Sequence, residues 1–169
     1  YLQSLWNPLV VQARIRGNLS PDIDQRLAWE PFLVLDKEVN AFALPGGYVG
    51  VNLGLIAVTS TPHEPASVLP HELSHITQRH IARSIASSKR QSLLSLASLV
   101  VGLLAASRSR NADAANAVIV GTQAAAVQGQ LNFSRDMERE ADRVGYTVMT
   151  SAGFAPGGMA AMFEKLDHG

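Results

Sequence analysis

The amino-acid sequence predicts an α+β fold that is predominantly helical and contains one small sheet. Segments with strand composition are confined to residues 32–53, where turn residues separate them. From Thr61 onward the chain has helical character, and another helix is expected near the N-terminus. The chain has 169 residues, of which 47% are hydrophobic, so it can bury a core, and we expect one domain over residues 1–169.

Residues 1–60 contain the expected sheet. We expect a helix over Tyr1–Arg16 and a polar turn over Gly17–Asp24. Asp36–Glu38 and Pro45–Gly47 supply turns, because Asp, Gly and Pro favour the backbone angles that turns require. These turns separate three expected strands, which are Phe32–Leu35, Val39–Leu44 and Tyr48–Leu53.

The next expected helix begins well before Pro70. Thr61-Pro62-His63-Glu64 offers a capping threonine, a proline at the first helical position and a glutamate that completes a capping box. Pro70 removes one hydrogen bond of this helix and disfavours helical geometry at the preceding residue. We therefore expect a kink near Ala66–Pro70 and a regular helix from His71 to His75.

An apolar segment follows at Leu93–Ala106. It is too short to span a bilayer, which needs about 20 apolar residues. We expect it to form a helical hairpin with Ala112–Gln130, joined across Ser107–Asp113. The favoured interpretation is a buried core helix. The other is a flap over a cleft that contacts a membrane surface or a partner through residues 93–106.

Charge and composition exclude several classes of protein. The 14 basic and 14 acidic residues give zero net charge, so the chain lacks the excess of positive charge that is typical of nucleic-acid-binding proteins. There is no cysteine, so disulfides and thiolate chemistry are excluded. The opening residues, Tyr1–Pro8, have neither the basic region nor the long apolar core of a signal peptide.

Five consecutive residues, His71-Glu72-Leu73-Ser74-His75, carry the strongest functional signal. They match the pattern H-E-x-x-H, which on a helix places two imidazoles on one face about one turn apart. Two neutral imidazoles at this spacing can bind one Zn²⁺, and Glu72 then lies close enough to take a proton from a metal-bound water. Because short patterns also arise by chance, the metal interpretation needs a third ligand.

The third ligand is expected within Glu138-Arg139-Glu140-Ala141-Asp142, since a catalytic zinc has three protein ligands and one open position. On a helix Glu138 shares a face with Asp142 and Gly145, and this face is otherwise small enough to pack closely on the histidine helix. Glu140 points roughly 200° away from Glu138. We therefore predict Glu138 as the ligand and Glu140 as a surface charge.

Asp142 is expected to accept a hydrogen bond from His71, because ligating histidines usually donate their second ring N–H to a carboxylate. In the alternative, Glu138 and its charged neighbours form a solvated face with ion pairs four residues apart, which leaves the two histidines without a third partner. His80 lies roughly 140° from the ligand face and is predicted to pack either in the core or behind the metal ligands.

Three stretches of the sequence together resemble one family. They are Asn40–Gly47 with Val49–Leu55, Val68–His80 and Ser134–Gly145. The order H-E-x-x-H followed by E-x-x-x-D is similar to that of the thermolysin-like zinc peptidases, the gluzincins. The three stretches resemble the HtpX/BepA-type zinc metallopeptidases, and more the soluble periplasmic BepA branch than the membrane-embedded HtpX branch.

For the site, the resemblance implies a zincin-like peptidase fold with the small sheet beside the H-E-x-x-H helix and one Zn²⁺ per chain. It implies His71, His75 and Glu138 as zinc ligands and Glu72 as the catalytic base. Asp142 matches a family aspartate that orients a ligand or assists proton transfer.

The resemblance also implies where a polypeptide substrate binds. Peptidases of this type commonly take substrate as an additional strand on an exposed sheet edge, and Asn40 and Ala41 occupy the corresponding position. In the alternative, Asn40 is a turn residue after Asp36–Val39.

For the biological role, the resemblance implies an endopeptidase that acts on unfolded or misassembled envelope proteins in a Gram-negative periplasm, with contact to the outer-membrane protein assembly machinery. Members of this branch often carry a helical-repeat domain after the peptidase. One alternative is a zinc-stabilised periplasmic chaperone or assembly scaffold with an occluded site, against which Glu72 argues. The other is a metal-dependent hydrolase of non-peptide bonds, against which the strand-like edge at Asn40-Ala41 argues.

Overall fold

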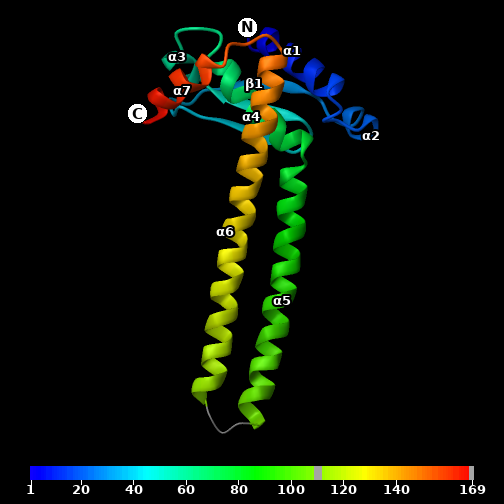
Figure 1. Ribbon diagram of the computed structural model, residues 1–169, viewed down its shortest axis with the longest axis vertical. Coiled ribbons are helices and arrows are strands. Elements are labelled where there is room, and N and C mark those ends of the chain that lie inside the picture. The colour runs from blue at the N-terminus through cyan, green and yellow to red at the C-terminus, as the bar shows by residue number, and fades with distance from the viewer. Residues whose placement is uncertain (109–111, 168–169) are drawn as a thin grey trace. The chain divides into compact units, whose positions relative to one another are not determined.

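A computed structural model of the protein describes residues 1–108 and 112–167, and it confirms an α+β fold that is mostly helical (Figure 1). By internal contacts the chain forms two compact units, one made of Tyr1–His80 with Arg139–Gly169 and the other of Ile81–Glu138. The elements in chain order are α1 (Leu2–Ile15), α2 (Pro21–Asp24), β1 (Glu30–Val34), β2 (Ala41–Leu44), β3 (Tyr48–Asn52), α3 (Leu53–Val58), α4 (Pro65–Thr77), α5 (His80–Arg108), α6 (Ala112–Ser151) and α7 (Gly157–Asp167).

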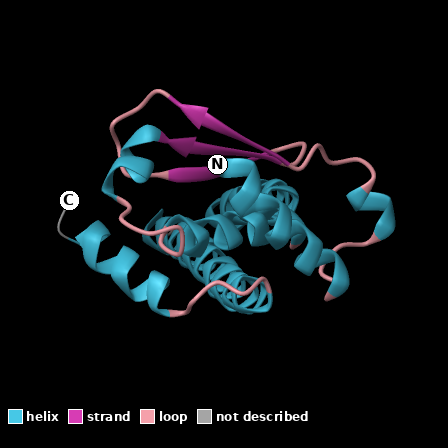
Figure 2. Ribbon diagram, turned by 90° about the horizontal axis from the view of Figure 1, so that it is seen from above, coloured by secondary structure: helices cyan, strands magenta, loops and turns pink. Residues whose placement is uncertain are grey.

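The sheet of the first unit has the strand order β1-β3-β2 and is mixed. β1 runs parallel to β3, and β2 runs antiparallel to it, so β2 lies at one edge. β2 also packs against α4, which places the sheet beside the H-E-x-x-H helix as predicted. Figure 2 shows the three strands as one layer.

The hairpin between β2 and β3 depends on two glycines. Gly46 has φ 94° and Gly47 has φ 87°, a conformation that side chains other than glycine rarely adopt. A Cβ atom on Gly47 would also lie 2.8 Å from Cβ of Leu27 and 3.0 Å from the backbone nitrogen of Ala28. The predicted turn at Pro45–Gly47 is therefore confirmed, and its glycines serve the turn geometry.

The core of the first unit is built around α1, which packs against α4 and β1. Trp6 and Leu9 are fully buried there. The indole Nε1–H of Trp6 donates to the carbonyl oxygen of Trp29 at 2.8 Å, and the indole Nε1–H of Trp29 donates to the carbonyl oxygen of Asp24 at 3.1 Å. Each partly or fully buried indole thus has the partner that burial of its polar N–H demands.

Four details of the N-terminal half differ from the sequence-based expectations. The helix predicted over Tyr1–Arg16 is present, but the predicted polar turn at Gly17–Asp24 contains the short helix α2. The first strand begins at Glu30, two residues early, and the second begins at Ala41, two residues late. Helix α3 was not predicted. Its apolar residues directly continue the strand pattern of β3, and periodicity alone does not separate two such short elements.

Helix α4 begins before Pro70, as predicted, but its first residue is Pro65 and not Pro62. Glu64 is the N-cap residue, and its Oε2 accepts a hydrogen bond from the backbone N–H of Ser60 at 3.1 Å. A capping box that starts at Thr61 would require Glu64 to accept from the N–H of Thr61 instead. The helix continues through Pro70, whose carbonyl oxygen accepts the hydroxyl of Ser74 at 2.7 Å. The kink at Ala66–Pro70 stays a prediction.

The second unit is the predicted helical hairpin, which consists of α5 and the part of α6 up to Glu138; the two helices lie side by side in Figure 1. The amide of Gln91 donates to the carbonyl oxygen of Ala126, and the guanidinium of Arg83 lies 6.0 Å from the ring centre of Phe133. A Cβ on Gly102 would lie 3.3 Å from Cγ1 of Ile119, which marks a close approach of the two helices. The connection predicted at Ser107–Asp113 includes residues 109–111, which lie outside the described residues.

The apolar segment of α5 is not a buried core helix, so the favoured interpretation of residues 93–106 was wrong. Leu93 is 68% exposed, Leu94 60% and Leu96 61%. Their apolar pattern predicted a helix correctly, but periodicity does not tell whether other parts of the chain cover that helix. Among the described helices, none combines the length and the hydropathy that crossing a membrane requires.

Candidate metal centre

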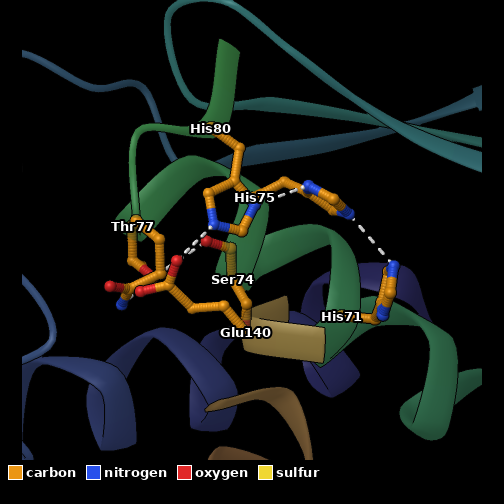
Figure 3. Close-up of polar contacts among 7 residues, drawn as sticks. His71, Ser74, His75, Thr77, His80 and Glu140 are labelled. Carbon is orange, nitrogen blue, oxygen red and sulfur yellow. Dashed lines mark hydrogen bonds and ion pairs between the residues drawn. The ribbon is translucent and has the colours of Figure 1, made fainter. Parts of the chain in front are cut away.

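Helix α4 places the two histidines of the H-E-x-x-H pattern one above the other. Nε2 of His71 lies 3.0 Å from Nε2 of His75, and the ring centres are 4.8 Å apart (Figure 3). Two nitrogen ligands of a tetrahedral zinc lie about 3.3 Å apart, as follows from Zn–N distances of about 2.0–2.1 Å. The two Nε2 atoms are therefore already close to the separation that one metal ion requires.

Glu138 provides the third potential ligand atom. One ligand atom from each of His71, His75 and Glu138 lies within 4.8 Å of the other two, so the three side chains could hold one metal ion. Two imidazoles and one carboxylate are the ligand set of several catalytic zinc sites that keep one position open. The residues present thus fit a catalytic metal ion.

Asp142 lies beside His71, as expected. Its Oδ1 is 2.8 Å from Nδ1 of His71, and the aspartate side chain is 59% exposed. If Nε2 of His71 binds a metal ion, the ring proton is on Nδ1, which then donates a hydrogen bond to the carboxylate. The carboxylate would thus favour the tautomer in which the lone pair of Nε2 can bind the metal.

A glycine allows α6 to approach α4 closely enough for this contact. A Cβ atom on Gly145 would lie 2.9 Å from the backbone nitrogen of His71 and 3.0 Å from the carbonyl carbon and oxygen of Pro70. Ala141, one turn earlier on the same face of α6, is fully buried. The small face predicted for this helix is therefore confirmed at both positions.

We expect Gly145→Ala to lower the free energy of unfolding by about 1–3 kcal/mol, because overpacking against a fixed backbone costs that much. The added methyl group presses on the backbone of His71, so zinc affinity should fall as well. Thermal unfolding and competition for zinc with a chelator measure the two effects. Gly129→Ala is the matched control on the same helix, since nothing lies within 4 Å of its Cβ position. Equal behaviour of the two variants would contradict the close approach.

Two further residues join the site, and one of them corrects a prediction. Glu140 is not a surface charge: its side chain is 26% exposed, and its Oε2 lies 3.2 Å from Nε2 of His80. His80 is buried, as predicted, and its Nδ1 lies 2.9 Å from Nδ1 of His75. The place of His80 behind a candidate ligand agrees with the prediction, whereas its contact with Glu140 was not predicted.

The end of α4 explains how His80 reaches His75. The helix stops at Thr77, and Arg79 adopts φ 57°, a left-handed conformation that ends helices. The chain thereby turns at Gln78-Arg79, and α5 begins at His80. The angle of roughly 140° assigned to His80 assumed an unbroken helix. No Gly or Asn marks the break, so the sequence held no signal for it.

Glu72, Asn40 and Ala41 are the remaining predicted site residues. Glu72 lies on α4 between the two histidines and is half-buried. Asn40 is exposed and directly precedes β2; its carbonyl oxygen accepts the backbone N–H of Asn52 at 3.0 Å. Ala41 is buried at the start of β2 and pairs with Val51. Asn40 and Ala41 thus lie at the beginning of an edge strand that packs against α4.

Comparison with known proteins gives matches over most of the chain. Residues 11–167 match the model of peptidase family M48. Over 166 residues, 98% of its length, the chain is 36% identical to the beta-barrel assembly-enhancing protease of Yersinia pestis and covers 32% of that protein. It is 38% identical over 135 residues to the protein of the same name from Escherichia coli (strain K12), which is 80% of this chain and 27% of that one.

A mitochondrial protein is similar as well. The mitochondrial metalloendopeptidase OMA1 of Schizosaccharomyces pombe is 34% identical over 142 residues, which are 83% of this chain and 38% of that protein. The chain therefore spans about a third of the length of these relatives.

Proposed function

Because the chain belongs to peptidase family M48, we propose that residues 1–169 form one zinc-dependent endopeptidase domain that binds one Zn²⁺ per chain. Membership of the family makes the chain a metallopeptidase, and polypeptides are its class of substrate. The observation that carries the choice of zinc is the grouping of His71, His75 and Glu138, whose ligand atoms lie within 4.8 Å of one another. This set of nitrogen and oxygen donors suits zinc.

The residues of the site divide the chemistry among them. A bound zinc supplies a Lewis acid that polarises the scissile carbonyl and lowers the pKa of water toward about 7. Glu72 takes the proton of the attacking water and returns it to the leaving amine. Asp142 holds the Nδ1–H of His71 and keeps that ring in its ligating orientation, which the distance of 2.8 Å supports.

The substrate binds in extended form along the free edge of β2, with Asn40 and Ala41 at its beginning. The position of β2 at the edge of the sheet and its packing against α4 support this part of the proposal. An added strand is bound through main-chain hydrogen bonds, which depend little on side chains. The domain would therefore cleave unfolded polypeptides with little sequence preference.

The biological substrates in this proposal are unfolded or misassembled envelope proteins in a Gram-negative periplasm. Two relatives named as beta-barrel assembly-enhancing proteases support this role and a contact with the outer-membrane protein assembly machinery. Residues 93–106 would contact a membrane surface or that machinery, which the exposure of Leu93, Leu94 and Leu96 supports.

Metal analysis combined with casein degradation tests the proposed function. The purified chain should hold about one zinc, lose casein cleavage when a chelator removes the metal, and regain it when zinc is added. Cleavage that continues in the metal-free protein would contradict a zinc-dependent peptidase. Full zinc occupancy without cleavage of casein would favour the chaperone or scaffold instead.

A further inference from the structure

We propose that Glu140 and His80 form a hydrogen-bonded relay that positions His75 as a metal ligand. The relay rests on the proposed function, because it acts through a ligand of the proposed zinc site. Its members form one continuous row from Glu140 through His80 to His75, and the row continues to His71 (Figure 3). All four residues belong to the same compact unit.

The directions of the two hydrogen bonds that link Glu140, His80 and His75 follow from metal binding. Nε2 of His75 faces Nε2 of His71, so it is the nitrogen that would bind the metal and would then carry no proton. The proton of the neutral ring is then on Nδ1, which donates across 2.9 Å to Nδ1 of His80. Because Nδ1 of His80 accepts, its proton is on Nε2, which donates across 3.2 Å to Oε2 of Glu140.

No other assignment satisfies these two contacts of His80 when the metal is bound. A proton on Nδ1 of His80 would face the proton on Nδ1 of His75, and two donors at 2.9 Å repel each other. Glu140 excludes that tautomer because a carboxylate accepts and does not donate. The carboxylate thus fixes the tautomer of His80, and His80 fixes that of His75.

The two candidate histidine ligands are therefore held differently. His71 is held directly by Asp142, whose side chain is 59% exposed. His75 is held through His80, whose side chain is only 3% exposed. The contact between His80 and His75 is therefore more shielded from water, and solvent competes with it less than with the contact between Asp142 and His71. Glu140 and His80 are positioning residues, because neither belongs to the grouped ligands.

Zinc dissociation constants of four variants of the full chain test the relay. Glu140→Leu and His80→Phe remove the acceptor or the whole bridge, and each should raise the dissociation constant about 10–100-fold, the usual effect of losing such an outer hydrogen bond. Glu140→Gln keeps an amide oxygen that accepts from Nε2–H, so it should restore most of the affinity. Asp136→Ala is the control, an exposed carboxylate one turn before Glu140 on α6, and it should bind zinc like the parent.

The ring tautomers of His75 and His80 in the zinc-loaded parent are a second readout. If Glu140 and His80 only stabilised the fold, these tautomers would not be fixed. Long-range ¹H–¹⁵N spectra should show the proton of His75 on Nδ1 and that of His80 on Nε2. A proton on Nδ1 of His80 would overturn the relay, even if His80→Phe failed to fold. Parent-like zinc affinity in both Glu140→Leu and His80→Phe would also overturn it, while leaving the proposed function intact. A parent chain that binds no zinc would overturn the proposed function itself.

Discussion

Replacing Glu72 by Gln is expected to abolish peptide-bond cleavage while the protein keeps its fold and its zinc. The glutamine side chain has nearly the same shape but cannot accept the proton of the attacking water, so general-base catalysis is lost. The rate should fall by about 10²–10⁴-fold, which is the usual contribution of such proton transfer. Casein or a model peptide measures the rate, and metal analysis measures the retained zinc.

Glu38→Gln is the control for this variant, because Glu38 is an exposed glutamate outside the metal centre. It should leave both the rate and the zinc content unchanged. Cleavage by the Glu72→Gln protein at the parent rate would show that another group acts as the base.

Replacing Glu138 by Gln is expected to weaken zinc binding more than any change outside the ligands. The amide is a poor substitute for a carboxylate ligand, and it removes a negative charge from beside the cation. The loss of affinity should therefore exceed the roughly 10–100-fold that an outer hydrogen bond contributes. Competition with a chromophoric chelator gives the dissociation constant, and cleavage should fall with zinc occupancy.

Glu140→Gln shows which of the two glutamates, Glu138 or Glu140, is the metal ligand. It should retain about one zinc with affinity close to that of the parent, because the amide oxygen still accepts from His80. Unchanged zinc binding after Glu138→Gln, together with loss of zinc after Glu140→Gln, would reverse the assignment of the ligand.

Helix geometry predicted individual contacts correctly where the helix is unbroken. Asp142 and Gly145 lie on one continuous helix, α6, and angular spacing placed them correctly against His71. The same arithmetic failed for His80, because Arg79 interrupts the helix in a conformation that arginine rarely adopts. The prediction of Glu140 as a surface charge failed for the same reason, because its partner His80 lies beyond the break at Arg79.

The sheet was predicted in part. Composition and turn residues located the three strands and the hairpin of β2 and β3, which is a local pairing. The parallel pairing of β1 with β3 joins segments that β2 separates in sequence, and no local pattern specifies it. The exposure of Leu93 and its neighbours was missed for a related reason, since burial depends on what the rest of the chain covers.

The buried contact between Trp6 and Trp29 has a practical consequence for following the unfolding of this chain. Both tryptophans belong to the unit that carries the histidines, and residues 81–138 contain neither Trp nor Tyr. Indole fluorescence therefore reports on that unit alone, whereas far-ultraviolet circular dichroism also detects the α5–α6 hairpin. If the hairpin melts separately, ellipticity will fall while the indole emission stays constant. Added zinc should move the fluorescence transition to higher temperature, because ligands stabilise the state that binds them.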